Sequence, residues 1–307
     1  MKICADVGGS FVDVAIFADD ATIVHQRKYP TPATDWPAFA RIFADLQRDH
    51  ADQLRVGDPI SIAVAGLIDP DTGVLTSANI ACIDGRALAS DLASLLDRPI
   101  VLINDADAFV LAEARLGVGK GHRLVFGIIL GTGVGGGLIE DGRVVTGGGG
   151  VGGEWGHGQI VTRSPIAPDA TPFFQCGCGR WGCLDTVGGA RGLERLHQFL
   201  HHVDATSRRI TEDWVTGDSA AAATIDFYCD LVAGPLAMLL NTVPATIVPV
   251  GGGLAGSTAL ICELDRRVRR DMLRATTHPV LVPSILGGNA GLLGAFLAGR
   301  RAADAEG

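Results

Sequence analysis

The amino-acid sequence predicts a two-lobed α/β protein. Its 307 residues exceed the usual size of a single hydrophobic core, so two lobes with a cleft between them are expected. Apolar strand-like runs alternate with segments of helical periodicity along most of the chain. An apolar strand, a glycine-rich turn and a second apolar strand occur at residues 2–18 and again at residues 124–140. Two copies of one hairpin indicate two related lobes, each offering a phosphate loop to the shared cleft.

The composition excludes several classes of protein. A formal net charge of -9 argues against a protein that binds the phosphate backbone of nucleic acids. The N-terminus, MKICADVGGSF, has no long apolar core followed by a small-residue cleavage site, and no segment reaches about eighteen uninterrupted apolar residues. We therefore expect a cytoplasmic protein that binds neither nucleic acid nor membranes.

The first hairpin places a carboxylate beside a glycine turn. Residues 2–8 form an apolar strand, residues 11–18 form the second, and Asp6 lies near the end of the first strand. The backbone N–H groups of Gly8, Gly9 and Ser10 can form a concavity that holds phosphate. Glycine turns between strands are also common without any ligand, so a purely structural turn stays an alternative.

The next elements predict a helix, a buried strand, a loop and a second helix. Residues 35–50 show helical spacing of apolar side chains, which indicates core packing. Residues 61–66 form a buried strand that opens into a turn-rich loop, in which Asn79 lies among small residues. Residues 86–96 form a helix that ends before Pro99.

A strand over residues 100–103 then ends at Asn104-Asp105, where a further helix starts. A lone Asp at a helix start is often an N-cap, which contributes about 1 kcal/mol. In an open α/β sheet, however, ligands bind beyond the carboxyl ends of the strands, so Asp105 also occupies the position of a catalytic carboxylate.

The second hairpin contains a formal dinucleotide-binding pattern. Gly131, Gly133 and Gly136 satisfy GxGxxG, but GLIEDGRVV follows, which predicts a hairpin and not the helix that a Rossmann fold requires. We therefore interpret the turn as a second phosphate loop.

The segment from Gly153 to Asp185 predicts a structural zinc site. His157, Cys176, Cys178 and Cys183 provide four ligands, enough to close a tetrahedral site. A disulfide or a chance cluster is the alternative. Glu154 and Asp185 are anchored beside these ligands, where fixed carboxylates suit a substrate rich in hydroxyl groups. They could equally be solvated loop charges.

The remaining chain predicts two helices at 189–203 and 218–241, a buried strand at 245–250 and a third glycine turn at 251–253. A helix over 258–273, a short strand near residue 280 and a final helix over 290–298 follow. The tail AADAEG is expected to fray.

Five motifs together carry a family resemblance: DVGGS, INDADA, GTGVGGG, GEWGH and CGCGRWGCLD. In this order and spacing they resemble the ROK family of bacterial sugar kinases and sugar-responsive repressors, over nearly the whole chain. The resemblance implies the actin and hexokinase type of fold, in which two lobes close over ATP and a sugar. It also implies Mg²⁺ and a structural Zn²⁺ as cofactors, and a homodimer.

The resemblance implies a role for each matching residue. Asp105 would be the general base that takes the proton from a sugar hydroxyl. The sugar would be bound by Gly66, Asn79, Asn104, Asp105, Glu154, His157 and Asp185. ATP and its Mg²⁺ would face Asp6, Gly8, Gly9, Ser10, Gly131, Thr132, Gly133, Gly252 and Gly253. His157 would contact the sugar with one ring nitrogen while the other nitrogen joins the cysteines on zinc.

The motifs look most like those of N-acetylglucosamine kinases, which make the 6-phosphate. A glucokinase or an N-acetylmannosamine kinase of the same family is the alternative. Asp185 stands where the family usually has Glu, which shortens the side chain by about 1.5 Å and puts its sugar contact in doubt. Ser10 replaces the commoner Thr and Asp107 a frequent Asn.

The family fold implies an N-terminal lobe of residues 1–118 and 288–307, with the first phosphate loop and the catalytic Asp. Residues 119–287 would form the C-terminal lobe, with the second phosphate loop, the zinc loop and the nucleoside side. A repressor would need a helix-turn-helix ahead of DVGGS, which begins at Asp6, so we expect an enzyme. A non-catalytic sugar sensor is the less favoured alternative.

Overall fold

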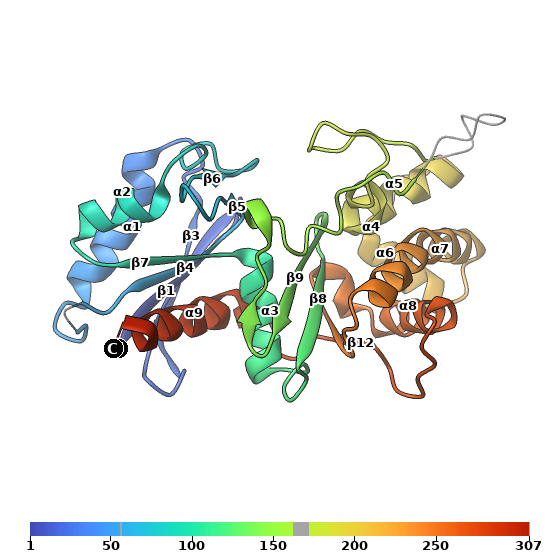
Figure 1. Ribbon diagram of the computed structural model, residues 1–307. Coiled ribbons are helices and arrows are strands. Elements are labelled where there is room, and N and C mark those ends of the chain that lie inside the picture. Colours follow the sequence, from blue (N-terminus) through green and yellow to red (C-terminus); the bar gives the residue numbers. More distant parts are fainter. Residues whose placement is uncertain (56, 162–171, 307) are drawn as a thin grey trace. The chain divides into compact units, whose positions relative to one another are not determined.

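The computed structural model describes residues 1–55, 57–161 and 172–306, which divide into two compact units (Figure 1). Unit 1 comprises Met1–Ala112, Val144–Gly152 and Leu286–Gly307, and unit 2 comprises Glu113–Arg143 and Gly153–Ile285. Each unit has its own sheet and its own hydrophobic core. The predicted α/β class is confirmed.

Unit 1 contains a five-stranded sheet with the order β3-β2-β1-β4-β7. The strands are β1 (Lys2–Val7), β2 (Phe11–Phe17), β3 (Ile23–Pro30), β4 (Ile60–Val64) and β7 (Ile100–Asn104). Strands β1, β2 and β3 pair antiparallel, whereas β1, β4 and β7 are parallel. The parallel strand β4 is buried at every position, which explains its uninterrupted apolar sequence. The short strands β5 (Leu67–Ile68) and β6 (Leu75–Thr76) pair separately.

Helices α1 (Trp36–Asp49), α2 (Leu88–Leu96), α3 (Asp105–Leu116) and α9 (Ala290–Glu306) belong wholly or partly to unit 1. Helix α1 begins where Asp35 accepts a hydrogen bond from the N–H of Ala38, at 2.9 Å. Its apolar stripe, which includes Phe39 and Phe43, is buried in the core together with residues of α2. Helix α9 packs on the sheet, since Phe296 stacks on Phe17 with ring centroids 4.9 Å apart.

Unit 2 repeats the strand order of unit 1. Its sheet is β10-β9-β8-β11-β12, formed by β8 (Leu124–Leu130), β9 (Val134–Glu140), β10 (Arg143–Val144), β11 (Val248–Gly251) and β12 (Leu281–Pro283). Strands β8 and β9 are antiparallel, and β8, β11 and β12 are parallel. The two glycine-rich hairpins expected from the sequence therefore hold equivalent places in two equivalent sheets.

The helices of unit 2 are α4 (Asp185–Gly188), α5 (Ala190–His201), α6 (Ser207–Val215), α7 (Ser219–Thr242) and α8 (Thr258–Asp271). Helix α7 is long and apolar enough to cross a membrane by length and composition. It is instead the central helix of the unit 2 core, where Tyr228, Val232 and Leu236 are fully buried. Helices α7 and α8 lie side by side (Figure 1).

Some elements were not predicted from the sequence, and one helix end was wrong. The helix expected over 189–203 is confirmed as α5, but the short helix α4 before it and α6 after it were not predicted. The final helix does not end at Ala298 but continues to Glu306, so the tail expected to fray is helical up to that residue.

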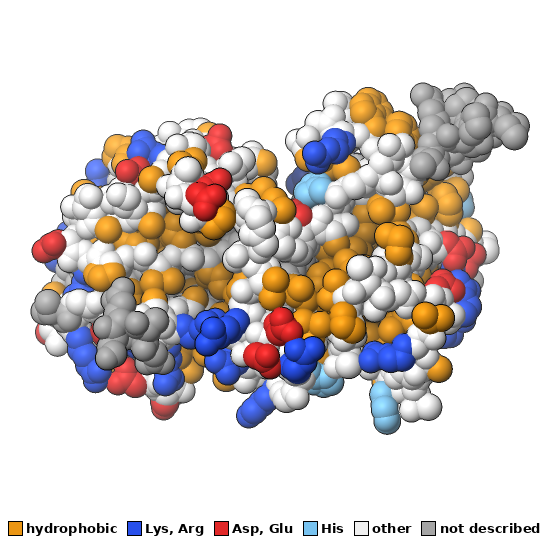
Figure 2. Space-filling view, viewed as in Figure 1, with side chains coloured by type: hydrophobic (Ala, Val, Ile, Leu, Met, Phe, Trp, Pro, Cys, Tyr) orange, Lys and Arg blue, Asp and Glu red, His pale blue; other side chains and the backbone are white. Residues whose placement is uncertain are grey.

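On the face shown in Figure 2, Lys and Arg side chains are interspersed with acidic ones and form no continuous basic area among the residues drawn in colour. This distribution agrees with the net charge of -9.

Candidate active site

The parallel strands of unit 1 bring several sequence-predicted site residues to one edge of the sheet. Because β1, β4 and β7 run in the same direction, their carboxyl ends lie together. Asp6 lies at the end of β1, Gly66 follows β4, and Asn104-Asp105 joins β7 to α3. This is the edge where open α/β sheets bind ligands.

The N-cap of α3 is Asn104 and not Asp105. The side-chain oxygen of Asn104 accepts the backbone N–H groups of Ala106 and Asp107, at 2.9 and 3.1 Å. Its amide nitrogen donates to the carbonyl of Gly66, at 2.9 Å, and to Oδ1 of Asp105, at 3.2 Å. Asn104 therefore caps the helix and holds Asp105 in place, while Oδ1 of Asp105 also accepts the N–H of Ala106, at 3.0 Å.

The charge of Asp105 affects the ionisation of Asp6. Burial, followed by the charges of Asp105 and Asp13, raises the pKa of Asp6 to about 7. Asp13 pairs with Asp6 across the hairpin, and Gln26 Nε2 donates to both Asp13 carboxylate oxygens, at 3.2 and 3.1 Å. A divalent cation would offset the mutual repulsion of these carboxylates, and carboxylate oxygens are ligands that Mg²⁺ accepts.

The first glycine turn is tight and partly exposed. The N–H of Gly8 donates to the carbonyl of Phe11, at 2.9 Å, and Thr31 Oγ1 donates to the carbonyl of Gly8, at 2.7 Å. Gly9 and Ser10 are exposed at its tip. Asn79 also lies here, since a Cβ atom on Gly9 would be 3.1 Å from the Cβ of Asn79. The structure thus places Asn79 beside the first turn. This contact could not be predicted from the sequence, because the two segments are far apart along the chain.

The glycine turns of unit 2 also lie at carboxyl ends of parallel strands. Gly131, Thr132 and Gly133 follow β8, with Thr132 exposed, and Gly252 and Gly253 follow β11. Gly252 has φ +85°, and a Cβ atom there would be 2.6 Å from the N of Gly131. Glycine at this position lets the two turns lie in contact.

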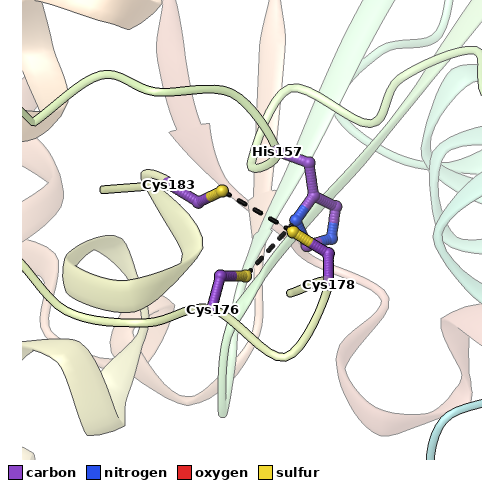
Figure 3. Close-up of side chains that lie close together, drawn as sticks. All are labelled: His157, Cys176, Cys178 and Cys183. Carbon is purple, nitrogen blue, oxygen red and sulfur yellow. Dashed lines mark hydrogen bonds between the residues drawn. The ribbon is translucent and has the colours of Figure 1, made fainter. Parts of the chain in front are cut away.

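The four predicted metal ligands converge in unit 2. The ligand atoms of His157, Cys176, Cys178 and Cys183 all lie within 4.8 Å of one another (Figure 3). Nδ1 of His157 is 3.6 Å from Sγ of Cys176, and the Sγ atoms of Cys178 and Cys183 are 3.7 Å apart. All three thiols are free, and the 3.7 Å separation excludes a disulfide in this structure. Three thiols and one imidazole at this spacing fit a tetrahedral Zn²⁺ site.

The carboxylates beside the cluster differ in their contacts. Oε2 of Glu154 is 3.6 Å from Nε2 of His157, so the imidazole faces the thiols with one nitrogen and Glu154 with the other. Burial raises the pKa of Glu154. Asp185, the first residue of α4, accepts the N–H of Val134 with Oδ1, at 2.8 Å. Neither carboxylate is the fully solvated loop charge that the sequence left open.

Trp155 makes a contact beside the candidate site that the sequence analysis did not predict. Its Nε1 donates to the carbonyl of Gly135, at 2.9 Å, and its ring occupies the space that a side chain on Gly136 would need. Trp155 thereby fastens the GEWGH segment to strand β9. Three consecutive glycines inside an apolar strand were the available signal, because glycine in a strand often marks a close approach.

Comparisons with known proteins agree with this architecture. The ROK family profile matches residues 2–301. An N-acetyl-D-glucosamine kinase from Citrobacter koseri is 33% identical over 291 residues, which cover 94% of this chain and 96% of that protein. The crystal structure of a ROK hexokinase from Thermus thermophilus has a TM-score of 0.82 and 29% identity, over 99% of both chains. A ROK family glucokinase from Streptomyces griseus, in complex with glucose and AMPPNP, has a TM-score of 0.79 and 25% identity, over 98% of this chain and 99% of that one.

The repeated sheets and the full-length structural matches define an α/β protein of the actin and hexokinase type. Within that class, the chain belongs to the ROK family.

Proposed function

We propose that the protein is an ATP-dependent sugar kinase, and that its sugar is N-acetyl-D-glucosamine, phosphorylated at the 6-hydroxyl. The observation that carries the proposal is the 33% identity to an N-acetyl-D-glucosamine kinase along 94% of the chain. The structural likeness to a glucokinase bound to glucose and AMPPNP supports the reaction class and keeps glucose as the alternative substrate. N-acetylmannosamine is a second alternative, because sequence motifs do not define the shape of the pocket for the N-acetyl group.

Asp105 is the proposed general base. It lies beyond the carboxyl end of β7 and is held by Asn104, at 3.2 Å. Its carboxylate would accept the proton of the sugar hydroxyl as that oxygen attacks the γ-phosphorus of ATP, while the bond from this phosphorus to the β,γ-bridging oxygen breaks and ADP leaves. Phosphoryl transfer requires little covalent help from the protein, so one oriented carboxylate and fixed phosphates suffice.

The glycine turns are proposed to bind the nucleotide. Backbone N–H groups of Gly8–Ser10 in unit 1 and of Gly131–Gly133 in unit 2 can donate to phosphate oxygens, and Gly252-Gly253 would lie beside the nucleoside. Asp6 would face Mg²⁺, which neutralises phosphate charge when bound.

The sugar hydroxyls are proposed to bind Asn104, Glu154 and His157, with Gly66 and Asn79 supporting the same site and Asp185 adjacent to it. His157 Nδ1 faces the thiols and Nε2 faces Glu154, which supports a structural Zn²⁺ that fixes the imidazole tautomer. The metal would supply rigidity to the segment and no chemistry.

The test is coupled ADP release with Mg-ATP across N-acetylglucosamine, N-acetylmannosamine, glucose, mannose and allose. We expect the highest kcat/KM with N-acetylglucosamine. A clear preference for glucose or N-acetylmannosamine would contradict the proposed substrate but would still support the proposed reaction class. If folded, zinc-containing protein released no ADP with any of these sugars but still bound sugar measurably, the result would instead indicate a sugar sensor.

A further inference from the structure

Asp185 connects the proposed metal site to the glycine turn between β8 and β9. Oδ1 of Asp185 accepts the N–H of Val134, at 2.8 Å, and Val134 is buried. Gly133 approaches so closely that a Cβ atom there would overlap the Asp185 carboxylate. The Asp185 side chain therefore packs directly against the turn.

The other side of the same residue faces the thiol cluster. Oδ2 of Asp185 lies 3.6 Å from Sγ of Cys176, and the backbone N–H of Asp185 donates to the carbonyl of Gly156, at 2.9 Å. Gly156 immediately precedes His157. One residue thus contacts the turn, a cysteine ligand and the segment that carries the histidine ligand.

Two further hydrogen bonds fasten the turn to the same region of the chain. The N–H of Ala190 donates to the carbonyl of Gly131, at 2.7 Å, and Nε1 of Trp155 donates to the carbonyl of Gly135, at 2.9 Å. The turn that we assign to ATP phosphates is thus held by Trp155, Asp185 and Ala190, which lie close in sequence to candidate zinc ligands.

We propose that Asp185 is a positioning residue for the nucleotide. Its contacts with the region of the zinc site and with the phosphate-binding turn make the conformation of the turn depend on the bound metal. This proposal rests on the assignment of that turn to ATP. The Asp185 side chain reaches the Val134 N–H with its Oδ1. Loss of the metal would release Cys183, two residues before Asp185, and His157, next to its backbone partner Gly156. Asp185 would then be held less firmly, and the buried Val134 N–H would lose its fixed acceptor.

The experiment compares Asp185→Ala, Asp185→Asn and the exposed-site control Asp204→Ala with the wild type. Calorimetry would measure the affinities for AMPPNP and for N-acetylglucosamine separately, before and after removal of zinc with a chelator, with the zinc content determined in each sample. We expect Asp185→Ala to retain zinc and to bind AMPPNP at least about tenfold more weakly. Asp185→Asn retains an oxygen acceptor and should fall between Asp185→Ala and the wild type.

The coupling itself is tested by the double comparison. Zinc removal should weaken AMPPNP binding in the wild type and have a much smaller effect in Asp185→Ala, because the connection is already broken. An equal effect of zinc removal in both proteins would overturn the proposal, as would a loss of sugar affinity with nucleotide affinity unchanged.

Hydrogen exchange of the peptide over residues 131–137 provides a readout without any ligand. Zinc removal should accelerate exchange at the Val134 amide in the wild type, and Asp185→Ala should show that fast exchange already in the zinc-loaded protein. If the wild type bound no nucleotide, the kinase assignment would fall, whereas this exchange pattern would still decide whether Asp185 braces the turn.

Discussion

At the residue scale, the sequence alone could not tell which of Asn104 and Asp105 caps helix α3 and which is available as the proposed general base. Helix starts are uncertain by one or two residues in any sequence pattern, so Asp105 could be interpreted as the cap. In the structure Asn104 accepts the N–H groups of Ala106 and Asp107 and donates to Asp105. The two residues should therefore respond differently to substitution.

Asp105→Asn should lower kcat by about 10²-fold or more, the usual contribution of a general base. Sugar affinity and the free energy of unfolding should stay close to those of the wild type, because Asn keeps the oxygen that accepts the Ala106 N–H. Asn104→Ala should instead destabilise the protein by about 1 kcal/mol. Coupled ADP release, sugar calorimetry and urea unfolding check these outcomes. Near wild-type turnover in Asp105→Asn would remove Asp105 from the mechanism.

At the element scale, the metal segment is expected to depend on its ion. Cys178→Ser removes one of four ligands, so we expect the zinc content to fall and sugar binding to weaken, because Glu154 and His157 lie on the same segment. Elemental analysis and sugar calorimetry measure the two effects. Cys262→Ser, at an exposed free cysteine, is the matched control. Wild-type protein purified without any bound zinc would contradict the assignment.

The packing of α5 against α7 predicts a dependence of stability on pH. Nδ1 of His197 and Nε2 of His201 lie 2.9 and 3.1 Å from Oγ1 of Thr224, which itself donates to the carbonyl of Ala220. Burial, followed by the charge of His201, lowers the pKa of His197 below its usual 6.5. As the pH falls through 6.5, the unfolded chain takes up a proton that the folded His197 resists, so the contribution to stability present above that pH is lost.

The raised pKa of Asp6 acts in the opposite direction over this range, so the effect of His197 is measured as a difference between variants. In urea unfolding, lowering the pH from 7.5 to 5.5 should change the free energy of unfolding less favourably in the wild type than in His197→Gln, which keeps a donor near Thr224. His202→Asn, at an exposed position, should behave like the wild type. The same pH dependence in His197→Gln and in the wild type would show that other groups cause it.

The elements that sequence patterns predicted are those with strong periodicity or continuous apolar runs. Both glycine hairpins, β4 and α7 belong to this group. Strand β3 was missed because HQRKY is polar, and it is a largely exposed edge strand. The end of α9 was placed too early because a tail of small and charged residues has no apolar stripe, although Ala favours helix.

At the scale of the whole molecule, the repeated hairpin predicted two lobes, and the structure gives two units with the same strand order. The return of Val144–Gly152 to unit 1 could not be predicted, because this glycine-rich stretch has no periodic pattern and its place depends on contacts distant in sequence. One such contact is the close approach of Gly150 to the carbonyl of Ile68. The choice of sugar escapes sequence reasoning for the same reason, since pocket shape arises from several loops.

Two separate cores should give the molecule two unfolding transitions. Phe43 is fully buried in the core of unit 1, and Leu236 is fully buried in that of unit 2. Phe43→Ala and Leu236→Ala should each cost about 2–5 kcal/mol, but each in its own unit. In scanning calorimetry the total enthalpy should exceed the van't Hoff enthalpy, and each variant should lower only one transition temperature. Hydrogen exchange of peptides from α1 and α7 identifies the unit that opens. A single transition that both substitutions lower alike would mean that the units unfold as one cooperative body.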